Sequence, residues 1–268
     1  MQLIDIGANL THESFALDRE TVVREALALG VTQFGITGTT IALSEQAVLL
    51  ARAQPDLMFA TAGVHPHHAR DVDADAVQAL SGFAALSEVR AVGETGLDYF
   101  RDLAPRPVQL KAFERQIAIA VACGKPLFLH QRDAHEDFLA VMKGARDSVV
   151  GGVVHCFTDS REALFAYLDL DLYIGITGWL CDERRGAHLR ELVRHIPAER
   201  LLVETDSPYL MPRTLVPKPA HRRNEPKFLP HIVEELARDR DEPFEVTAAS
   251  TTAAARTLFA LKDSATPL

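Results

Sequence analysis

The sequence has little cysteine, and its three thiols are far apart, at Cys123, Cys156 and Cys181. An odd number of widely spaced cysteines indicates neither a disulfide framework nor a thiolate zinc site. The sequence also lacks any apolar run of the ~18 residues that a membrane-spanning helix needs. Its first residues show no basic segment followed by a long apolar one, which a secretory signal would have. We therefore expect a reduced, cytoplasmic protein with no membrane partner.

Positive charge is scarce overall, and the formal net charge is −9 at pH 7. This balance argues against a nucleic-acid partner, but the basic residues are concentrated in one part of the chain. Between Arg184 and Lys227 there are ten Lys or Arg and five Asp or Glu. A local excess of positive charge can bind phosphates on an otherwise acidic protein. The alternative is an ordinary solvated surface.

Short apolar runs alternate with segments of helical periodicity, and no linker or low-complexity tract interrupts them. The predicted strands end near Ile6, Ile36, Val64, Glu94, His130, His155, Ile176 and Asp206. Spacings of roughly 20–35 residues are typical of successive βα units. For 268 residues, of which 47% are hydrophobic, this pattern predicts one domain over residues 1–268. The predicted fold is an α/β (β/α)8 TIM barrel.

Helices are predicted where apolar residues recur at a spacing of three or four. The segments are 18–30, 108–123, 184–195, 228–238 and 244–261. The first ends at Gly30 and the second stops before Gly124, as expected for helix termination by glycine. The third is an amphipathic basic helix followed by Pro197.

Four of the predicted strands end in a side chain that can bind a metal ion: Glu94, His130, His155 and Asp206. A lone histidine after an apolar run is usually structural, but four such residues at the catalytic end of a barrel indicate a metallohydrolase. Nitrogen and oxygen ligands without thiolate suit Mg²⁺, Mn²⁺ or Zn²⁺. Such an ion would polarise a phosphoryl or carbonyl oxygen and lower the pKa of a bound water. Glu94 could bridge two ions, and Asp206 could bind metal or accept the proton of the attacking water.

Three histidines follow the third predicted strand, in Gly63-Val-His-Pro-His-His68. We expect His65 to contact the scissile phosphate or donate a proton, and we expect His67 and His68 to be loop residues.

Two further loops carry candidate substrate contacts. The loop from Ala220 to Pro226 contains Arg222, Arg223, Asn224 and Glu225. Arginine forks suit phosphate oxygens, although an ion-pair cluster that pins the loop to the barrel explains the same residues equally well. The only tryptophan, Trp179, is followed by Arg184 and Arg185, a combination that can stack bases and attract phosphates. Buried packing of Trp179 is the alternative.

Together these motifs resemble the TatD-family deoxyribonucleases, from Asp5 to about Leu261. The matching segments are Gly63–His67, Gly93–Asp98, His130–Ala134, His155–Thr158, Tyr173–Gly178, Glu204–Tyr209 and Arg223–Pro226. The resemblance implies a barrel of the metallo-dependent hydrolase type. Its implied activity is that of a 3′–5′ exonuclease acting on DNA, preferably single-stranded, or on RNA. Such an enzyme leaves 5′-phosphomonoesters and acts in DNA repair or degradation.

By motif position, the resemblance implies metal-site roles for Glu94, His130, His155 and Asp206. Glu94, Asp206 and His65 are then the catalytic candidates. His65 and the Arg223–Pro226 loop are implied substrate contacts.

One segment departs from the wider family. Gly7 and Asn9 stand where a His-x-His pair would bind the first metal. We therefore expect one firm metal site on Glu94, His130 and His155, with Mg²⁺ favoured over Mn²⁺ or Zn²⁺ and any second ion weaker. We also expect a monomer. The alternatives are a metal-dependent amide or ester hydrolase, such as an aminoacyl-tRNA deacylase, and a non-catalytic nucleic-acid-binding relative.

Overall fold

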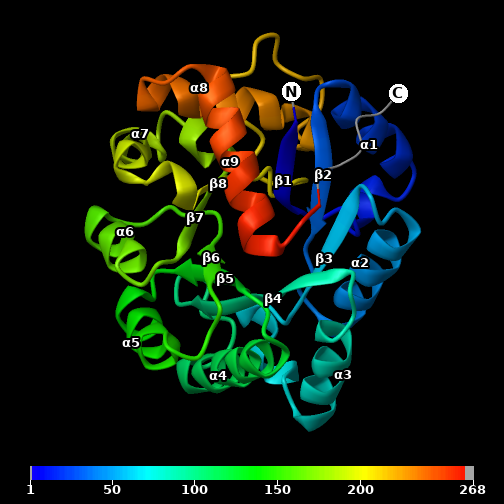
Figure 1. Cartoon of the computed structure of the whole chain (residues 1–268), viewed down its shortest axis with the longest axis vertical. Coiled ribbons are helices and arrows are strands. Elements are labelled where there is room, and N and C mark those ends of the chain that lie inside the picture. Colours follow the sequence, from blue (N-terminus) through cyan, green and yellow to red (C-terminus); the bar gives the residue numbers. More distant parts are fainter. Residues whose placement is uncertain (1, 263–268) are drawn as a thin grey trace. The chain divides into compact units, whose positions relative to one another are not determined.

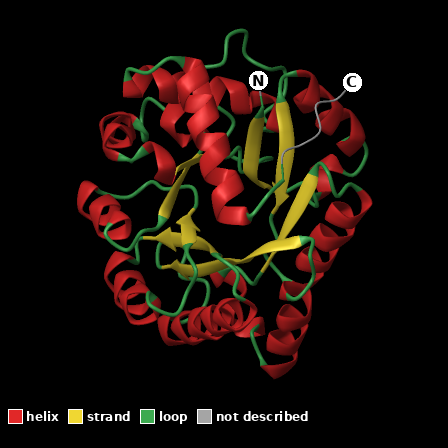
Figure 2. Cartoon of the chain, viewed as in Figure 1, coloured by secondary structure: helices red, strands yellow, loops and turns green. Residues whose placement is uncertain are grey.

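The structure, a computed structural model, describes residues 2–262 (Figure 1). Within that range, strands alternate with helices along the chain (Figure 2), and the strands follow one another in the order β1 to β8 in one eight-stranded sheet. The strands are β1 (Leu3–Ala8), β2 (Val31–Ile36), β3 (Met58–Ala62), β4 (Val89–Asp98), β5 (Leu127–Arg132), β6 (Gly152–Val154), β7 (Tyr173–Ile176) and β8 (Leu201–Val203). This confirms the predicted (β/α)8 barrel.

The contacts within the described residues divide the chain into two compact units. The first unit comprises residues 2–36, 156–158 and 174–262, and the second comprises residues 37–155 and 159–173. In the first unit β1 pairs with β2 and β7 with β8; in the second, β3, β4, β5 and β6 pair in turn, all in parallel. The single domain over residues 1–268 stays a prediction.

The helices are α1 (Arg19–Ala28), α2 (Ile41–Ala53), α3 (Ala74–Ala84), α4 (Arg106–Cys123), α5 (His135–Ala145), α6 (Arg161–Leu168), α7 (Ala187–Leu192), α8 (Leu229–Arg240) and α9 (Phe244–Phe259). The helix predicted from residue 184 to 195 begins only at Ala187, and after α7 it continues as a 3₁₀ helix over Val193–His195. The carboxylate of Asp182 accepts hydrogen bonds from the backbone and side chain of Arg184, which fixes a turn there. Among residues 2–262, no helix is both long and apolar enough to cross a membrane.

Five of the predicted strand ends, those of β1, β3, β4, β5 and β8, lie two to four residues from the observed ones. Strand β4 continues to Asp98 and β5 to Arg132, so Glu94 and His130 lie inside strands. The longer pairing places Gly96 opposite His130 and Asp98 opposite Arg132. Strand β8 ends at Val203 instead of near Asp206, whose φ of 52° is left-handed and cannot continue a strand.

In the first unit, β1 is tied to the segment after β8 by a buried carboxylate. Ala8 pairs with Ser207, and α9 packs against both β1 and β8 (Figure 1). Asp5 is fully buried and accepts hydrogen bonds from the backbone N–H of Thr205 at 2.9 Å and from its hydroxyl at 2.5 Å. Burial outweighs these hydrogen bonds and raises the pKa of Asp5 to about 7.

This raised pKa predicts a pH-dependent stability that Asp5→Asn should remove. The folded state holds the Asp5 proton more tightly, so the stabilisation is complete below the usual pKa of 3.8 and is lost as pH rises through about 7. Between pH 5 and 8 the wild-type free energy of unfolding should fall by roughly 2–3 kcal/mol more than that of the variant. Urea unfolding at both pH values measures this. The exposed Asp56→Asn serves as control, and parallel pH profiles for wild type and Asp5→Asn would contradict the assignment.

Candidate metal centre

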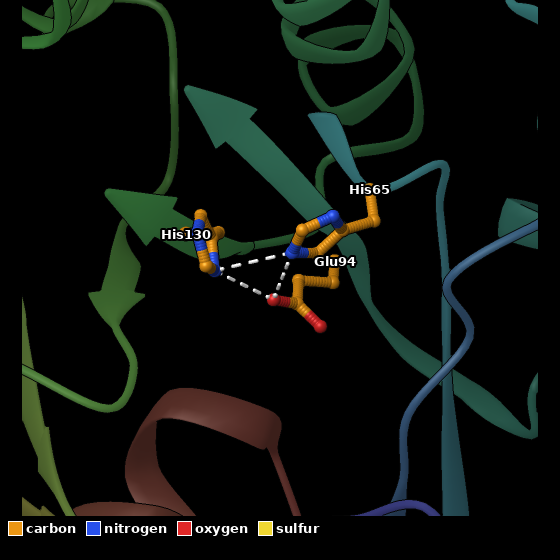
Figure 3. Close-up of side chains that lie close together, drawn as sticks. All are labelled: His65, Glu94 and His130. Carbon is orange, nitrogen blue, oxygen red and sulfur yellow. Dashed lines mark hydrogen bonds and ion pairs between the residues drawn. The ribbon is translucent and has the colours of Figure 1, made fainter. Parts of the chain in front are cut away.

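Four predicted site residues converge in the second unit. His65 follows β3, Glu94 lies in β4, His130 lies in β5, and His155 directly follows β6. His65, Glu94 and His130 each offer a ligand atom within 4.8 Å of the others (Figure 3). Parallel strands in sequential order place these positions next to one another.

Glycines bring the strands close enough for this convergence. Gly93 precedes Glu94 with φ 144°, and a Cβ there would lie 2.2 Å from the carbonyl oxygen of Phe128. Gly96 has φ 142°, and its Cβ would lie 1.9 Å from the carbonyl oxygen of His130. No side chain fits at either position, so β4 approaches β5 backbone to backbone.

One carboxylate oxygen is the centre of the cluster. Glu94 Oε1 lies 2.8 Å from His155 Nε2, 2.9 Å from His130 Nδ1 and 3.3 Å from His65 Nε2. His65 Nε2 and His130 Nδ1 are 3.3 Å apart. Glu94 and His155 are buried, so solvent does not compete for these groups.

These separations fit a metal ion. Ligands bound at about 2.0–2.2 Å in tetrahedral or octahedral geometry lie about 3.0–3.5 Å from one another. The side chains of His65, Glu94 and His130 already meet that spacing within a few tenths of an ångström. A set of imidazole nitrogens with one carboxylate can therefore hold an ion with little rearrangement.

The pKa shifts in the cluster suit metal binding at His65 and Glu94 and oppose it at His130. Burial lowers the pKa of His65 to about 4, so its ring is neutral at pH 7 and keeps a lone pair for a metal. Burial alone would raise the pKa of Glu94, but the imidazoles of His155 and His65 outweigh it and hold the pKa well below the usual value. Burial would lower the pKa of His130, whereas hydrogen bonds to Asp98 and Glu94 raise it.

Asp98 extends this cluster and was missed as a site residue by the sequence reasoning. Its Oδ2 lies 2.7 Å from His67 Nε2 and 3.3 Å from His130 Nε2. Burial would raise the pKa of Asp98, but its hydrogen bonds to His130 and His67 lower it. The signal was present, because residues four apart in a strand share a face and Asp98 follows Glu94 by four. His67, expected to be a loop residue, belongs to the same network.

Asp206, predicted as a ligand or proton acceptor, lies in the first unit. The backbone N–H of Asp206 donates to the Gly7 carbonyl at 2.8 Å. Asn9 Nδ2 donates to Asp206 Oδ1 at 3.0 Å. Asn9, which replaces one of the strand-one histidines, therefore orients the Asp206 carboxylate.

The contacts of the loop after β8 agree with the alternative interpretation of its charged residues, an ion-pair cluster that fixes the loop in place. Arg223 forms ion pairs with Asp18 at 2.7 Å and with Glu225 at 2.8 Å. Asn224 is fully buried and donates to the Thr205 carbonyl, and Glu225 is buried and also pairs with Lys227. These side chains fix the loop, and in this conformation they have little capacity left for a substrate.

The remaining predicted contacts lie around one cavity in the first unit. Trp179, Arg184, Arg185 and Arg222 line a cavity of about 760 Å³. The Arg185 guanidinium stacks 4.2 Å from the Trp179 ring centroid, the aromatic–arginine combination that the sequence suggested.

Comparisons with known proteins agree with the predicted family. Residues 4–260 match the family model of TatD-related DNases. The "3′-5′ ssDNA/RNA exonuclease TatD" of Pantoea ananatis is 50% identical over 259 residues, which cover 97% of this chain and 100% of that protein. The protein of the same name from Salmonella typhimurium is 51% identical over 257 residues, 96% and 98% of the two chains.

Solved structures support the fold. The TatD homologue YjjV of Escherichia coli has a TM-score of 0.89 at 24% identity and covers 97% of this chain and 98% of its own. A TatD-family hydrolase of Entamoeba histolytica has a TM-score of 0.88 at 23% identity and covers 98% and 99%. The family match over residues 4–260 and the half-identical relatives show that this chain belongs to the TatD-related DNase family.

Proposed function

We propose that the protein is a metal-dependent 3′–5′ exonuclease that hydrolyses phosphodiester bonds of single-stranded DNA and RNA. The observation that carries this proposal is the convergence of three imidazoles on the Glu94 carboxylate, in a chain half identical to relatives named for that activity. The hydrolysis breaks the bond between phosphorus and the preceding O3′ and releases a 5′-mononucleotide.

In this proposal each residue of the site has its own role. Glu94, His130, His155 and His65 would hold the metal, and when bound it would polarise a phosphate oxygen and lower the pKa of a water. Asp206 accepts the proton of the attacking water, and its hydrogen bond from Asn9 orients the accepting carboxylate. Asp98 orients His130 through the ring nitrogen that faces away from Glu94. Metal-binding histidines commonly contact a carboxylate in this way.

The identity of the ion is part of the proposal. Mg²⁺ was expected because the strand-one histidines are missing. The donor set at Glu94 now favours a more nitrogen-tolerant ion, because His65 adds a third imidazole and Mg²⁺ prefers oxygen ligands. We propose one principal site that takes Mn²⁺ or Zn²⁺ at lower concentration than Mg²⁺.

Labelled oligonucleotides test the function directly. Single-stranded DNA and RNA carrying a 3′ or 5′ label are incubated with Mg²⁺, Mn²⁺, Zn²⁺ or EDTA. We expect metal-dependent shortening from the 3′ end and none in EDTA. Metal-dependent cleavage of amides or esters alone would favour the aminoacyl-tRNA deacylase alternative. DNA binding without hydrolysis under any metal would favour a non-catalytic relative.

Asp98→Asn should weaken metal binding without unfolding the protein. Asparagine keeps the volume but removes the charge that faces His130 and His67, and the loss of such a partner typically costs about 10–100-fold in metal affinity or activity. Titrating activity against metal concentration, together with calorimetric metal binding, measures the shift. The exposed Asp147→Asn is the matched control. A metal dependence identical to that of the wild type would exclude a positioning role for Asp98.

A further inference from the structure

A cavity of the first unit lies between two loops that follow neighbouring strands. One wall is the segment after β7, residues 178–185, and the other is part of the loop after β8, residues 210–222. A Cβ on Gly178 would lie 2.3 Å from the carbonyl oxygen of Leu210, and one on Gly186 would lie 2.1 Å from that of Trp179. The missing side chains let the first loop fold back on itself and press against the second, so the two walls are held in place.

The residues that line this cavity are mainly of two kinds, apolar and basic. Trp179, Leu210, Met211 and Pro212 supply apolar surface. The lining also contains five Lys or Arg and only two acidic residues, although the whole chain is acidic. The volume of about 760 Å³ lies within the ~300–1,000 Å³ typical of small-ligand pockets.

The two acidic residues orient the arginines of the cavity. Asp182 is buried, and its carboxylate pairs with Arg184 at 3.3 Å and Arg185 at 3.1 Å. Glu183 pairs with Arg213 at 3.2 Å. The side chains of these arginines still expose 44–60% of their surface, so their remaining N–H groups can reach a ligand. Lys218 and Arg222 are exposed as well.

We propose that this cavity binds one nucleotide of a single-stranded nucleic acid. The base stacks against the pair formed by the Trp179 ring and the Arg185 guanidinium, and the phosphate contacts Arg213, Lys218 and Arg222. A basic groove beside an aromatic platform is the combination that binds single strands without reading their sequence. The proposal rests on the proposed exonuclease function and adds to it a subsite with two residues, Arg213 and Lys218, outside all the motifs that identify the family.

The single tryptophan makes the subsite directly observable. Trp179 is the only tryptophan in the chain, so protein fluorescence excited selectively in tryptophan reports on this cavity. Wild-type protein in EDTA, where the strand is not cleaved, is titrated with a short oligodeoxythymidylate. We expect a saturable change in fluorescence. A strand of equal length with abasic residues keeps the phosphates but lacks the bases, and we expect it to bind at least about tenfold more weakly.

Variants separate the two halves of the subsite. Arg213→Ala with Lys218→Ala should raise the Kd for the oligodeoxythymidylate at least about tenfold. It should also reduce the slope of log Kd against log salt by at most about 0.7, the contribution of one phosphate of a single strand. Anisotropy of a labelled strand should show about a tenfold rise in Kd for Trp179→Ala and little change for Trp179→Phe. The exposed Arg24→Ala, in the same unit, is the charge control and should bind like the wild type.

The outcomes distinguish this proposal from the function on which it rests. If the wild type degrades DNA, but its fluorescence does not respond and the double variant binds normally, the subsite is wrong and the exonuclease stands. If fluorescence and variants respond as expected but no metal supports hydrolysis, the subsite stands and the exonuclease is wrong. Equal affinity for the abasic strand would overturn the stacking of a base on Trp179. Circular dichroism of each variant confirms that it is folded.

Discussion

Glu94→Gln should reduce kcat/KM on single-stranded DNA at least about a thousandfold, which corresponds to about 4 kcal/mol of transition-state stabilisation. The substitution keeps the size of the side chain but replaces the carboxylate on which His65, His130 and His155 converge. An amide has no charge to offset that of an ion. Its NH₂ group is a hydrogen-bond donor, and a metal ion repels it. The loss should appear with every metal, because it removes a ligand common to all of them.

Steady-state kinetics with calorimetric metal titration measure this effect. Glu114→Gln, an exposed change of the same chemistry on α4 in the second unit, is the control and should be indistinguishable from the wild type. Full activity of Glu94→Gln in saturating metal would remove the cluster from the mechanism. A thermal unfolding curve of each variant, taken without metal, shows whether the loss of activity arises at the site or from a less stable fold.

Gly96→Ala should destabilise the protein by at least about 3 kcal/mol and abolish activity as a consequence. The added Cβ would lie 1.9 Å from the carbonyl oxygen of His130, at a φ of 142° that side-chain-bearing residues rarely adopt. Backbone atoms cannot rotate away as a flexible side chain can. The pairing of β4 with β5 must therefore open beside His130.

A matched glycine provides the control for this prediction. Gly82 lies inside α3, and a Cβ there would meet nothing within 4 Å. Gly82→Ala should therefore stabilise the protein by about 0.5–1 kcal/mol, because alanine is the better helix former. Urea unfolding of both variants compares them on one scale. A Gly96→Ala variant as stable as Gly82→Ala would mean that β4 and β5 are not in close backbone contact.

The barrel and most of the metal cluster could be predicted from sequence because both depend on local patterns. Alternating apolar and helical segments set the order of the strands, and Glu94, His130 and His155 stand out as metal-binding residues next to apolar runs. Their exact relation to the strand ends could not be predicted. It depends on the pairing of β4 with β5, which places Gly96 opposite His130.

The predictions based on charge alone left two interpretations open, for a physical reason. Arg223 and its loop were compatible with either phosphate or a structural partner. The partner that it has, Asp18, lies 205 residues earlier in the chain. Nothing near Arg223 in the sequence reveals that contact. Asp98 was missed for a related reason, since its role becomes visible only when β4 is known to continue beyond Glu94.

The close contact of β4 with β5 also has a consequence for engineering. The spacing of the proposed ligands is set by backbone atoms at two positions that have no side chain, Gly93 and Gly96. Substitutions at the proposed ligands would leave this backbone spacing intact, whereas a single methyl group at either glycine would change it. A library designed to alter metal preference should therefore keep both glycines constant and vary His65, Asp98 and His155. The spacing between these positions would then stay the same while the side chains that bind the metal change.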